Sequence, residues 1–526
     1  PGAGTLPVGF QGRSALVAQR AKSRFRETNV VKVFRSCFLL CLDENAVPVY
    51  FLFLHEFQSQ YERYIMGDNG SSRETLGSRL GFILLTAGCA IGLGNIWRFP
   101  FVTGQNGGAL FVLIYLIFLF MLGFPVMVME LSLGRASRRN LYGAYKTLPK
   151  GSSFKWHWPG AVFFTGSAFL MIFYTTVTGW MIAYAVNYLN GSVAALGNEK
   201  EIIGYFNGFL ASPGRNVGYM LLTVLIGSVT CYLGLQKGVE RITKLMMAGL
   251  FLLLLGLCIR SCTLPGASAG LSFYLKPSLE PLETVGLFNI IVAALGQAFF
   301  TLSLGVGSIA IFGSYIDRDH SLAKESLVII ALDTIVAILA GVIIFPACFS
   351  YGVDAGSGPG LVFISLPNVF NHMPGGRWWG VLFFLFLSSA ALTTVIAVFE
   401  NLIAFMIDEW RLSRRKAVLL NGVGIGVLSL PCALGYNLLK WIEPLGKGST
   451  ILDLEDYIVS DNLLPLGSLY IVLFIAAGWG WKNFIAEANS GHGVKFPGWV
   501  RVYVCWIIPL LIFGLFAIGF YRRWLQ

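Results

Sequence analysis

The chain of 526 residues is 56% hydrophobic and only 12% charged, and its mean hydropathy is +0.69. A soluble protein of this length needs far more charge to cover its surface, so the composition excludes a soluble globular protein. The net charge of +11 does not indicate a nucleic-acid partner, because the basic residues gather in a few short loops.

Residues 1–65 differ from the rest of the chain. Their apolar run at 46–55 is too short to cross a membrane, and Asp43, Glu44 and Asn45 interrupt its approach. Both a signal sequence and an interfacial helix stay open for this run, although no small-residue cleavage pattern follows it. We expect 1–65 to be an upstream extension that is dispensable for function, and 66–526 to form the working domain.

Eleven apolar runs follow, each about long enough to cross a hydrocarbon core roughly 30 Å thick. They cover residues 79–101, 109–133, 160–189, 216–234, 241–263, 286–314, 325–350, 378–407, 416–436, 456–476 and 499–521. The sequence therefore predicts an all-α polytopic membrane protein with about eleven transmembrane helices.

The placement of positive charge predicts the orientation of the spans. The loops after the second and eighth spans hold basic clusters, namely Arg135, Arg138, Arg139, Lys146, Lys150 and Lys155, and Arg411, Arg414, Arg415 and Lys416. Positive loops stay in the cytoplasm, so we expect a multi-pass protein of the cell (inner) membrane with a cytoplasmic amino terminus. An eleventh span leaves Arg522 and Arg523 outside, which this rule disfavours. Eleven spans with that exception, and a count that differs by one, both stay open.

Two of the predicted spans are interrupted. The first breaks in GCAIGLGN (88–95), and the sixth breaks around 303–307 in GQAFFTLSLGVGSIAIF (296–312). The breaks lie five spans apart in the order of the chain, so corresponding spans run in opposite directions, as in an inverted repeat of spans 1–5 and 6–10. Unwound backbone survives at membrane depth only where it lines a cavity, and its free N–H and C=O groups attract anions and cations. We therefore expect a site for a carboxylate and a small cation at the breaks.

Close helix packing is the alternative explanation for these glycines. Gly88 and Gly92 have the spacing of a small-xxx-small packing face. Packing alone gives no use for an arginine within the membrane, yet Arg98 follows Asn95 here. Together with the matching break in the sixth span, Arg98 favours a binding site.

Three motifs resemble those of the neurotransmitter:sodium symporter family, and in particular of its bacterial amino-acid transporters. They are GCAIGLGNIWRFP at 88–100, TLSLGVG at 301–307 and KGVER at 237–241. The resemblance runs from about Arg73 to the carboxyl terminus and leaves out residues 1–70. It implies a leucine-transporter-like 5+5 inverted repeat within a transporter domain at 66–526. Repeat one would cover 79–263, repeat two 286–476, and an extra span 499–521.

The resemblance implies two sodium sites. The first would join the Ala90 carbonyl, Asn95, Thr301, Asp333 and the substrate carboxylate. The second would be formed by the carbonyls and hydroxyls of Gly88, Ile91, Ala390, Thr393 and Thr394. Threonines in apolar helices also bond back to the preceding turn, which is the structural alternative for Thr393 and Thr394.

Asp333 lies in the apolar run LVIIALDTIVAILAG (327–341), where a carboxylate is costly unless it is paired. Many family members carry asparagine here, and animal members bind a chloride ion nearby. The resemblance therefore implies that the fixed charge of Asp333 replaces the chloride, and that transport is independent of chloride.

The substrate class also follows from the resemblance. Members that carry amines without a carboxylate have aspartate at the position of Gly92, so glycine indicates a zwitterionic amino acid. Its binding residues would be Ala90, Gly94, Leu170, Phe173, Tyr174, Phe300, Thr301, Ser303, Val306, Thr394 and Val398. Val306 and Val398 are smaller than their counterparts in the leucine-preferring relative, which favours a hydrophobic or aromatic side chain.

Gates follow from the same resemblance. Arg98 and Asp456 would pair through water as the outer gate, and Arg73 and Asp408 would form the inner gate. Glu130 in the second span would brace the broken sixth helix. The resemblance assigns no role to Glu400 in the eighth span, where we expect only a buried hydrogen bond.

We therefore expect a secondary active symporter that couples inward sodium flow to amino-acid uptake by alternating access, with two sodium ions and no organic cofactor. It would work in the lipid bilayer as a monomer or weak homodimer, without nucleic acid. Two alternatives stay open: a proton-coupled permease in which Asp333 titrates, and a non-transporting amino-acid receptor, although no large soluble output domain is visible. An enzyme is not expected, because no nucleophile–base pair, metal cluster or phosphate loop stands out.

Overall fold

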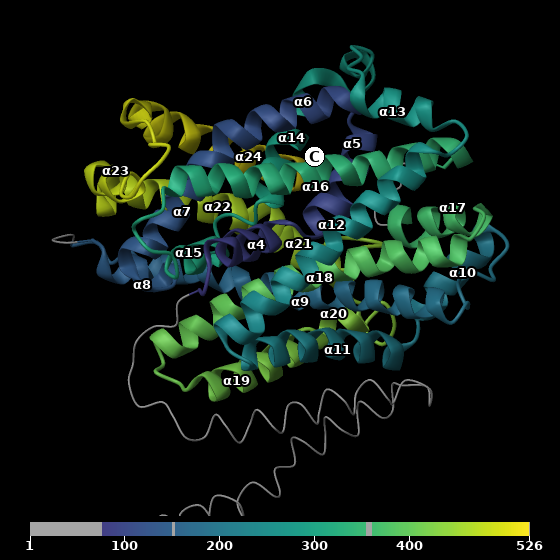
Figure 1. Cartoon of the computed structure of the whole chain (residues 1–526), viewed down its shortest axis with the longest axis horizontal. Helices are drawn as coiled ribbons and strands as arrows, with labels where there is room; N and C mark the ends of the chain where they lie inside the picture. Colours follow the sequence, from purple (N-terminus) through teal and green to yellow (C-terminus); the bar gives the residue numbers. More distant parts are fainter. Residues whose placement is uncertain (1–75, 150–152, 354–359, 525–526) are drawn as a thin grey trace, which may run out of the picture. The chain divides into compact units, whose positions relative to one another are not determined.

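The computed structural model describes residues 76–149, 153–353 and 360–524, whose regular elements are helices (Figure 1). The expected extension at 1–65 and the expected gate residue Arg73 lie outside the described residues. The first half of the described chain forms α4 (Arg79–Ala90), η1 (Gly94–Arg98), α5 (Phe99–Gln105), α6 (Ala109–Phe118), η2 (Leu119–Gly123), α7 (Phe124–Ser137), α8 (Leu141–Thr147), α9 (His157–Leu189), α10 (Glu199–Leu210), α11 (Pro213–Tyr232), η3 (Leu235–Glu240), α12 (Arg241–Cys262) and α13 (Ala267–Leu275).

The second half follows the same helical pattern. It forms η4 (Leu282–Gly286), α14 (Leu287–Thr301), α15 (Ser308–Gly313), α16 (Leu322–Tyr351), η5 (Leu361–Ser365), α17 (Leu366–His372), α18 (Gly376–Asp408), α19 (Arg414–Leu428), α20 (Leu430–Leu434), α21 (Ile451–Asp456), η6 (Tyr457–Leu463), α22 (Leu464–Leu473), η7 (Phe474–Trp479), α23 (Trp481–Ala488), η8 (Gly498–Val500), η9 (Tyr503–Ile507) and α24 (Ile508–Trp524).

Nine helical segments of the described chain are long and apolar enough to cross a membrane, and α4 with the η1–α5 segment adds a tenth as a bent pair. The predicted fourth span corresponds to α11, which is continuous over 20 residues but is not among the nine. Arg215 and Asn216 in its first turn lower its apolar content. The expected count of about eleven spans is therefore not confirmed.

The first predicted span is broken, as expected. α4 ends at Ala90, where the backbone of Ile91 becomes extended (φ −70°, ψ 95°), and helical structure resumes at Gly94. The two halves are bent by 52° from each other. Peptide groups on both sides of the break are left without a partner in the helix ladder.

The sixth predicted span is broken in the same way. α14 ends at Thr301 and α15 begins at Ser308. Between them, Ser303, Gly305 and Gly307 have φ angles of 50°, 95° and 89°. Side chains disfavour this left-handed region and glycine tolerates it, so the glycines of TLSLGVG allow the break.

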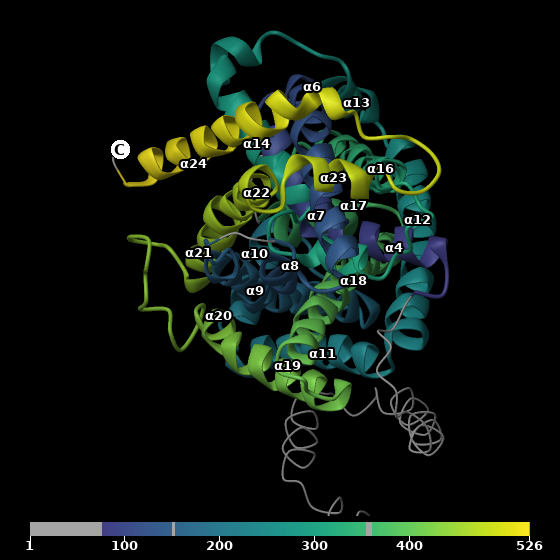
Figure 2. The ribbon, with the colours of Figure 1, turned by 90° about the vertical axis from the view of Figure 1, so that its left-hand side faces the viewer.

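The two longest helices, α9 and α18, lie beside both breaks. They lie side by side, with α11 beside them, in both ribbon views (Figures 1 and 2). α18 also packs against α4 and α15, which are halves of the two broken spans. Because α18 contacts one half of each broken span, the two breaks lie close together in the interior.

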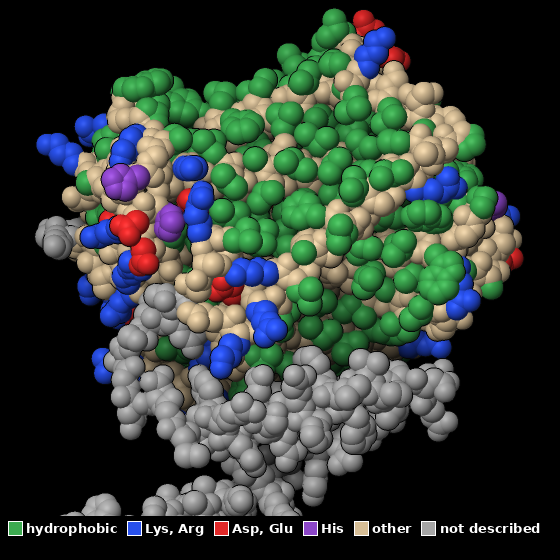
Figure 3. Space-filling model, in the orientation of Figure 1, with side chains coloured by type: hydrophobic (Ala, Val, Ile, Leu, Met, Phe, Trp, Pro, Cys, Tyr) green, Lys and Arg blue, Asp and Glu red, His purple; other side chains and the backbone are tan. Residues whose placement is uncertain are grey.

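The surface matches a set of lipid-facing spans. Figure 3 shows hydrophobic side chains over the middle of α12 and α16, while charged side chains gather at the end that carries α8, α15 and α23. Large apolar side chains such as Leu252 and Leu510 are mostly exposed. Proteins that cross the hydrocarbon core of a membrane have such an apolar band with charged residues at its ends.

Candidate functional site

A cavity lies between the two breaks. It is lined by Ala90, Gly92, Leu93, Gly94, Leu170, Tyr174, Phe300, Ser303, Thr394 and Leu464. Most of the residues predicted to contact the substrate are therefore in its wall. Four others, Phe173, Thr301, Val306 and Val398, are buried but do not line it. Leu464 of α22 was not predicted, because nothing in its apolar run marks it.

Gly92 leaves no room for a side chain. A Cβ atom added there would lie 2.3 Å from the Tyr174 hydroxyl and 2.7 Å from Thr394 Oγ1. The Tyr174 hydroxyl accepts a hydrogen bond from the Leu93 N–H at 3.1 Å. A hydroxyl can accept and donate at once, so that of Tyr174 can also donate to a carboxylate in the cavity.

Asn95, Thr301 and Asp333 come together beside the cavity from η1, α14 and α16. Asn95 Nδ2 donates to Asp333 Oδ1 at 2.8 Å, and Thr301 Oγ1 donates to Asp333 Oδ2 at 3.3 Å. All three side chains are buried. A carboxylate without water needs such donors or a cation, and clustered oxygen atoms are the ligands that small hard cations prefer. The predicted first sodium residues are thus neighbours.

The predicted second sodium residues also meet, where α18 crosses the end of α4. Thr394 Oγ1 lies 3.2 Å from the Gly88 carbonyl oxygen and 3.5 Å from that of Ile91. Thr393 Oγ1 donates to the Ala390 carbonyl at 2.7 Å, which is the return bond expected of a threonine in an apolar helix. Carbonyls and hydroxyls from two helices therefore converge at one point.

Glu130 braces the second break from α7. Its carboxylate accepts hydrogen bonds from the N–H groups of Gly305 (3.0 Å), Ile309 (3.2 Å) and Ala310 (3.3 Å). The side chain is fully buried. These are the N–H groups that the break leaves without helical partners, so the expected role of Glu130 matches the geometry.

Arg98 packs on a residue of the cavity wall. Its guanidinium is 4.3 Å from the centroid of the Phe300 ring, which lines the cavity. Asp456, its expected partner, accepts instead from Ser460 Oγ at 2.5 Å. Within the described ranges these two residues form no direct ion pair, and a water-mediated pair between them stays a prediction.

The base of α4 is held by residues that were not predicted. Glu240 of the KGVER motif accepts from the Gly77 N–H at 2.7 Å and from Ser78 Oγ at 2.9 Å. Arg79 forms an ion pair with the buried Glu325 at 2.8 Å. Glu240 could have been predicted from the sequence, because it is a charged residue within the KGVER motif. For Glu325 there was no indication in the sequence beyond its place at the start of a span.

Asp408, the expected partner of Arg73, binds the residue that caps a neighbouring helix. One of its carboxylate oxygens accepts from Asn140 Nδ2 at 3.2 Å. Asn140 in turn caps the amino end of α8.

Glu400 has stronger partners than the single hydrogen bond expected for it. Arg414 Nη2 pairs with its carboxylate at 2.5 Å, and the Tyr315 hydroxyl donates to the same carboxylate at 3.1 Å. Glu400 thus joins α18 to the start of α19 and to the turn after α15.

Known proteins resemble this chain along most of its length. The family model "Sodium:neurotransmitter symporter family" matches residues 73–197 and 199–523. A sodium-dependent transporter of Haemophilus influenzae is 35% identical over 86% of this chain and 99% of its own length, and one of Bacillus subtilis is 35% identical over 84% and 96%. The crystal structure of MhsT in complex with L-phenylalanine superposes with a TM-score of 0.77, at 36% identity over 85% of this chain and 100% of that one.

These matches confirm the expected fold and the expected absence of an enzymatic role, since the family is one of sodium-coupled transporters. The apolar helices place it in a membrane as a multi-pass protein. The chain belongs to the sodium:neurotransmitter symporter family and is a sodium-dependent transporter.

Proposed function

We propose that this transporter is a symporter that takes up a zwitterionic, hydrophobic or aromatic amino acid together with sodium by alternating access. The observation that supports it best is the cavity between the two breaks. Backbone groups, the Tyr174 hydroxyl and Thr394 line this space, and the buried Asp333 cluster lies beside it. One chamber thus offers groups for a carboxylate, an ammonium and a small cation.

Each part of the substrate has a complementary group in the wall. The carboxylate binds the first sodium, backbone N–H groups of the first break and the Tyr174 hydroxyl. The ammonium binds carbonyl oxygens of the broken spans and Thr394. The side chain packs on Leu170, Phe300 and Leu464, which are the apolar part of the lining. Gly92 excludes a carboxylate of the protein's own, so the substrate supplies one.

Two sodium ions complete the site in this proposal. The first binds at Ala90, Asn95, Thr301 and Asp333, and the second binds at Gly88, Ile91, Ala390, Thr393 and Thr394. The second ion fixes the end of α4 to α18 and thereby favours the state that is open to the outside. Bound substrate then permits closure and release to the cytoplasm.

The proposal also covers the membrane location, the oligomeric state, the domain bounds and the gates. The protein works in the cell (inner) membrane with its amino terminus in the cytoplasm, as a monomer or weak homodimer. Residues 1–65 are dispensable, and 66–526 form the transporter domain. Arg98 with Asp456, and Arg73 with Asp408, act as the gates.

Competition binding in purified protein tests the substrate and the ion together. Labelled L-phenylalanine is displaced by each of the twenty amino acids and by phenethylamine, with and without sodium. Hydrophobic and aromatic amino acids should compete only in sodium, and the amine should not compete because it lacks the carboxylate. Thr301→Ala should weaken the sodium dependence, whereas Thr165→Ala, an exposed threonine of α9, should not.

Two results would count against the proposal. Equal sodium dependence in the native protein and in Thr301→Ala would remove the first ion site. Uptake driven by a pH gradient without sodium would favour the proton-coupled alternative, in which the buried Asp333 carries the proton.

A further inference from the structure

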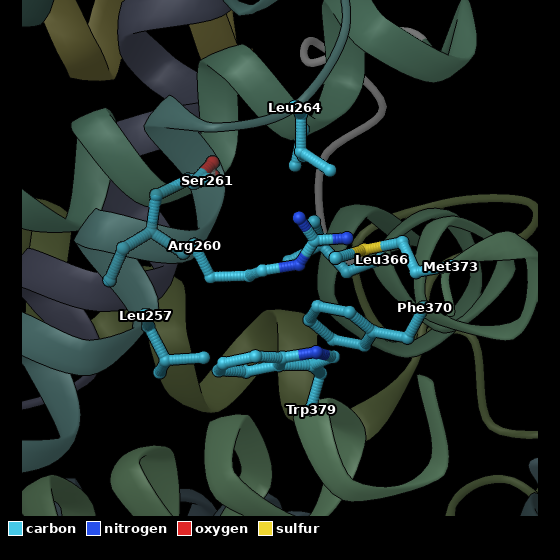
Figure 4. A pocket seen from close by; sticks show the side chains of 10 residues that line it. Leu257, Arg260, Ser261, Leu264, Leu366, Phe370, Met373 and Trp379 are labelled. Carbon is cyan, nitrogen blue, oxygen red and sulfur yellow. Dashed lines mark hydrogen bonds between the residues drawn. The ribbon is translucent and has the colours of Figure 1, made fainter. Parts of the chain in front are cut away.

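A second cavity lies away from the breaks, at the end of α12 opposite to the KGVER motif (Figure 4). It is lined by Leu257, Arg260, Ser261, Leu264, Ile343, Ala347, Leu366, Phe370, Met373 and Trp379. These residues come from α12 and the turn after it, from α16, from α17, and from the start of α18 and the turn before it. The wall is mainly apolar, and none of its lining residues is acidic.

Arg260 is the only charged residue among those that line this cavity. Figure 4 shows its side chain reaching across the space between Leu264 and the rings of Phe370 and Trp379. The guanidinium carbon is 5.9 Å from the Trp379 ring centroid. Its hydrogen bond is a long one, from Nη1 to Thr263 Oγ1 at 3.3 Å, and it pairs with no carboxylate among the described residues. A guanidinium has five N–H donors, so most of them remain available.

Ser261, the other polar residue of the lining, is already occupied. Its hydroxyl donates to the Ile343 carbonyl at 2.6 Å. A polar ligand of this cavity would therefore meet Arg260 and the indole N–H of Trp379, and the rest of the ligand meets hydrocarbon.

An apolar stripe on the lipid-facing side of α12 ends next to the cavity in sequence. Leu245, Leu252, Leu255 and Ile259 are 75%, 73%, 57% and 60% exposed. Their spacing places them on one helix face, and the hydrophobic surface of Figure 3 extends over this helix. A hydrocarbon chain lying on this stripe ends at Ile259, and Arg260 follows about 100° around the helix, on the side that faces the cavity.

We propose that this cavity binds an anionic phospholipid, with its phosphate on Arg260 and an acyl chain along the α12 stripe. The planar fork of arginine matches two phosphate oxygens, and the Trp379 ring lies 5.9 Å from the guanidinium carbon, within the range of a cation–π contact. A zwitterionic headgroup would bring an ammonium that no lining residue neutralises. Free phosphate would gain nothing from the apolar wall.

Native mass spectrometry of the full chain tests this proposal. The protein is released from micelles that contain equal amounts of phosphatidylglycerol and phosphatidylcholine, and bound lipid is counted. The native chain should retain phosphatidylglycerol preferentially. Arg260→Gln should lower that retention by about tenfold, the factor expected for one charge-assisted contact, and leave phosphatidylcholine unchanged.

A matched control separates the site from general surface charge. Arg215 is exposed at the start of α11, which lies at the same end of the spans as Arg260, since the end of α11 leads into KGVER. Arg215→Gln should retain phosphatidylglycerol as the native chain does. Equal retention in Arg260→Gln and native protein, or an equal loss in Arg215→Gln, would overturn the proposal.

Two further measurements identify the source of the phosphate and test whether each variant is folded. Glycerol phosphate, which has no acyl chains, should not displace the lipid, and displacement would assign the site to free phosphate. Arg260→Lys keeps the charge without the fork and should retain an intermediate amount of phosphatidylglycerol. Sodium-dependent amino-acid binding by each variant reports that it is folded, and Arg260→Lys decides the question if Arg260→Gln does not fold.

Discussion

Glycines at the first break set the size of the substrate cavity. A Cβ atom at Gly92 would approach the Tyr174 hydroxyl to 2.3 Å, and one at Gly94 would approach Phe300 Cδ1 to 2.9 Å. Gly296 of α14 differs, because a Cβ atom there would meet nothing within 4 Å. The two glycines of the break therefore keep space open, whereas Gly296 does not.

Gly92→Ala should abolish most amino-acid binding. The added methyl group forces Tyr174 and Thr394 out of place, and overpacking of this kind costs about 1–3 kcal/mol, or about tenfold or more in affinity. Labelled amino-acid binding in sodium measures the loss. Gly296→Ala is the control and should bind normally; unimpaired binding by Gly92→Ala would contradict the close packing inferred here.

Uptake should not depend on chloride, because Asp333 supplies a fixed negative charge beside the first sodium residues. Replacement of chloride by gluconate should leave sodium-driven uptake by the native protein unchanged. Asp333→Asn removes the charge and should lower uptake in gluconate, with partial recovery in chloride. Asp317→Asn changes an exposed carboxylate and serves as the control. A large loss of native uptake in gluconate would refute the prediction.

At the scale of elements, α7 acts as a support for the broken sixth span. Glu130 binds three N–H groups at the break, and α7 and α15 touch backbone to backbone. A Cβ atom at Gly134 would lie 1.7 Å from the Ala310 carbonyl oxygen. This support gives three N–H groups around the break a partner, which helps the helix to stay interrupted at membrane depth.

Glu130→Gln should destabilise the protein. The new amide places a donor against backbone N–H groups, and an unsatisfied buried donor costs about 1–3 kcal/mol. Thermal unfolding in detergent should show a lower midpoint, together with weaker amino-acid binding. Glu283→Gln, at an exposed position of η4, should change neither. An unchanged midpoint in Glu130→Gln would mean that the carboxylate does not support the break.

At the scale of the whole molecule, both breaks face one cavity. Different residues hold the first broken span on the two sides of its break. Glu240 and Glu325 hold the base of α4, while Arg98 rests on Phe300 at the other side of the break. The Glu240 and Glu325 carboxylates are buried, and removing the partner of a buried carboxylate costs about 3–5 kcal/mol.

The voltage dependence of accumulation should report two sodium ions per substrate. Two charges moving through 100 mV release about 4.6 kcal/mol, at about 2.3 kcal/mol per charge. At about 1.4 kcal/mol per tenfold, this sustains slightly over three decades of accumulation. Proteoliposomes with a potassium-set potential measure the ratio. One ion would give about half that slope, and no slope would exclude net charge entry with the substrate.

Much of the architecture was predictable from the sequence. Apolar runs of membrane length predicted the spans, and the glycines, Asn95 and TLSLGVG located both breaks, because helix length and helix interruption are local properties of the chain. The count of eleven was less secure, since α11 mixes apolar residues with Arg215 and Asn216. The gathering of Asn95, Thr301 and Asp333 followed from the family resemblance and was not derivable from spacing.

By itself, the sequence determined that this is a membrane protein with two interrupted spans and a carboxylate at their level. Only the tertiary structure decided that Leu464 lines the cavity, that Glu400 pairs with Arg414, and that Arg260 faces Trp379 across a second cavity. The physical reason is that span formation depends on the solvation of consecutive residues. Side-chain partners between helices depend on how those helices cross, and no local pattern records that.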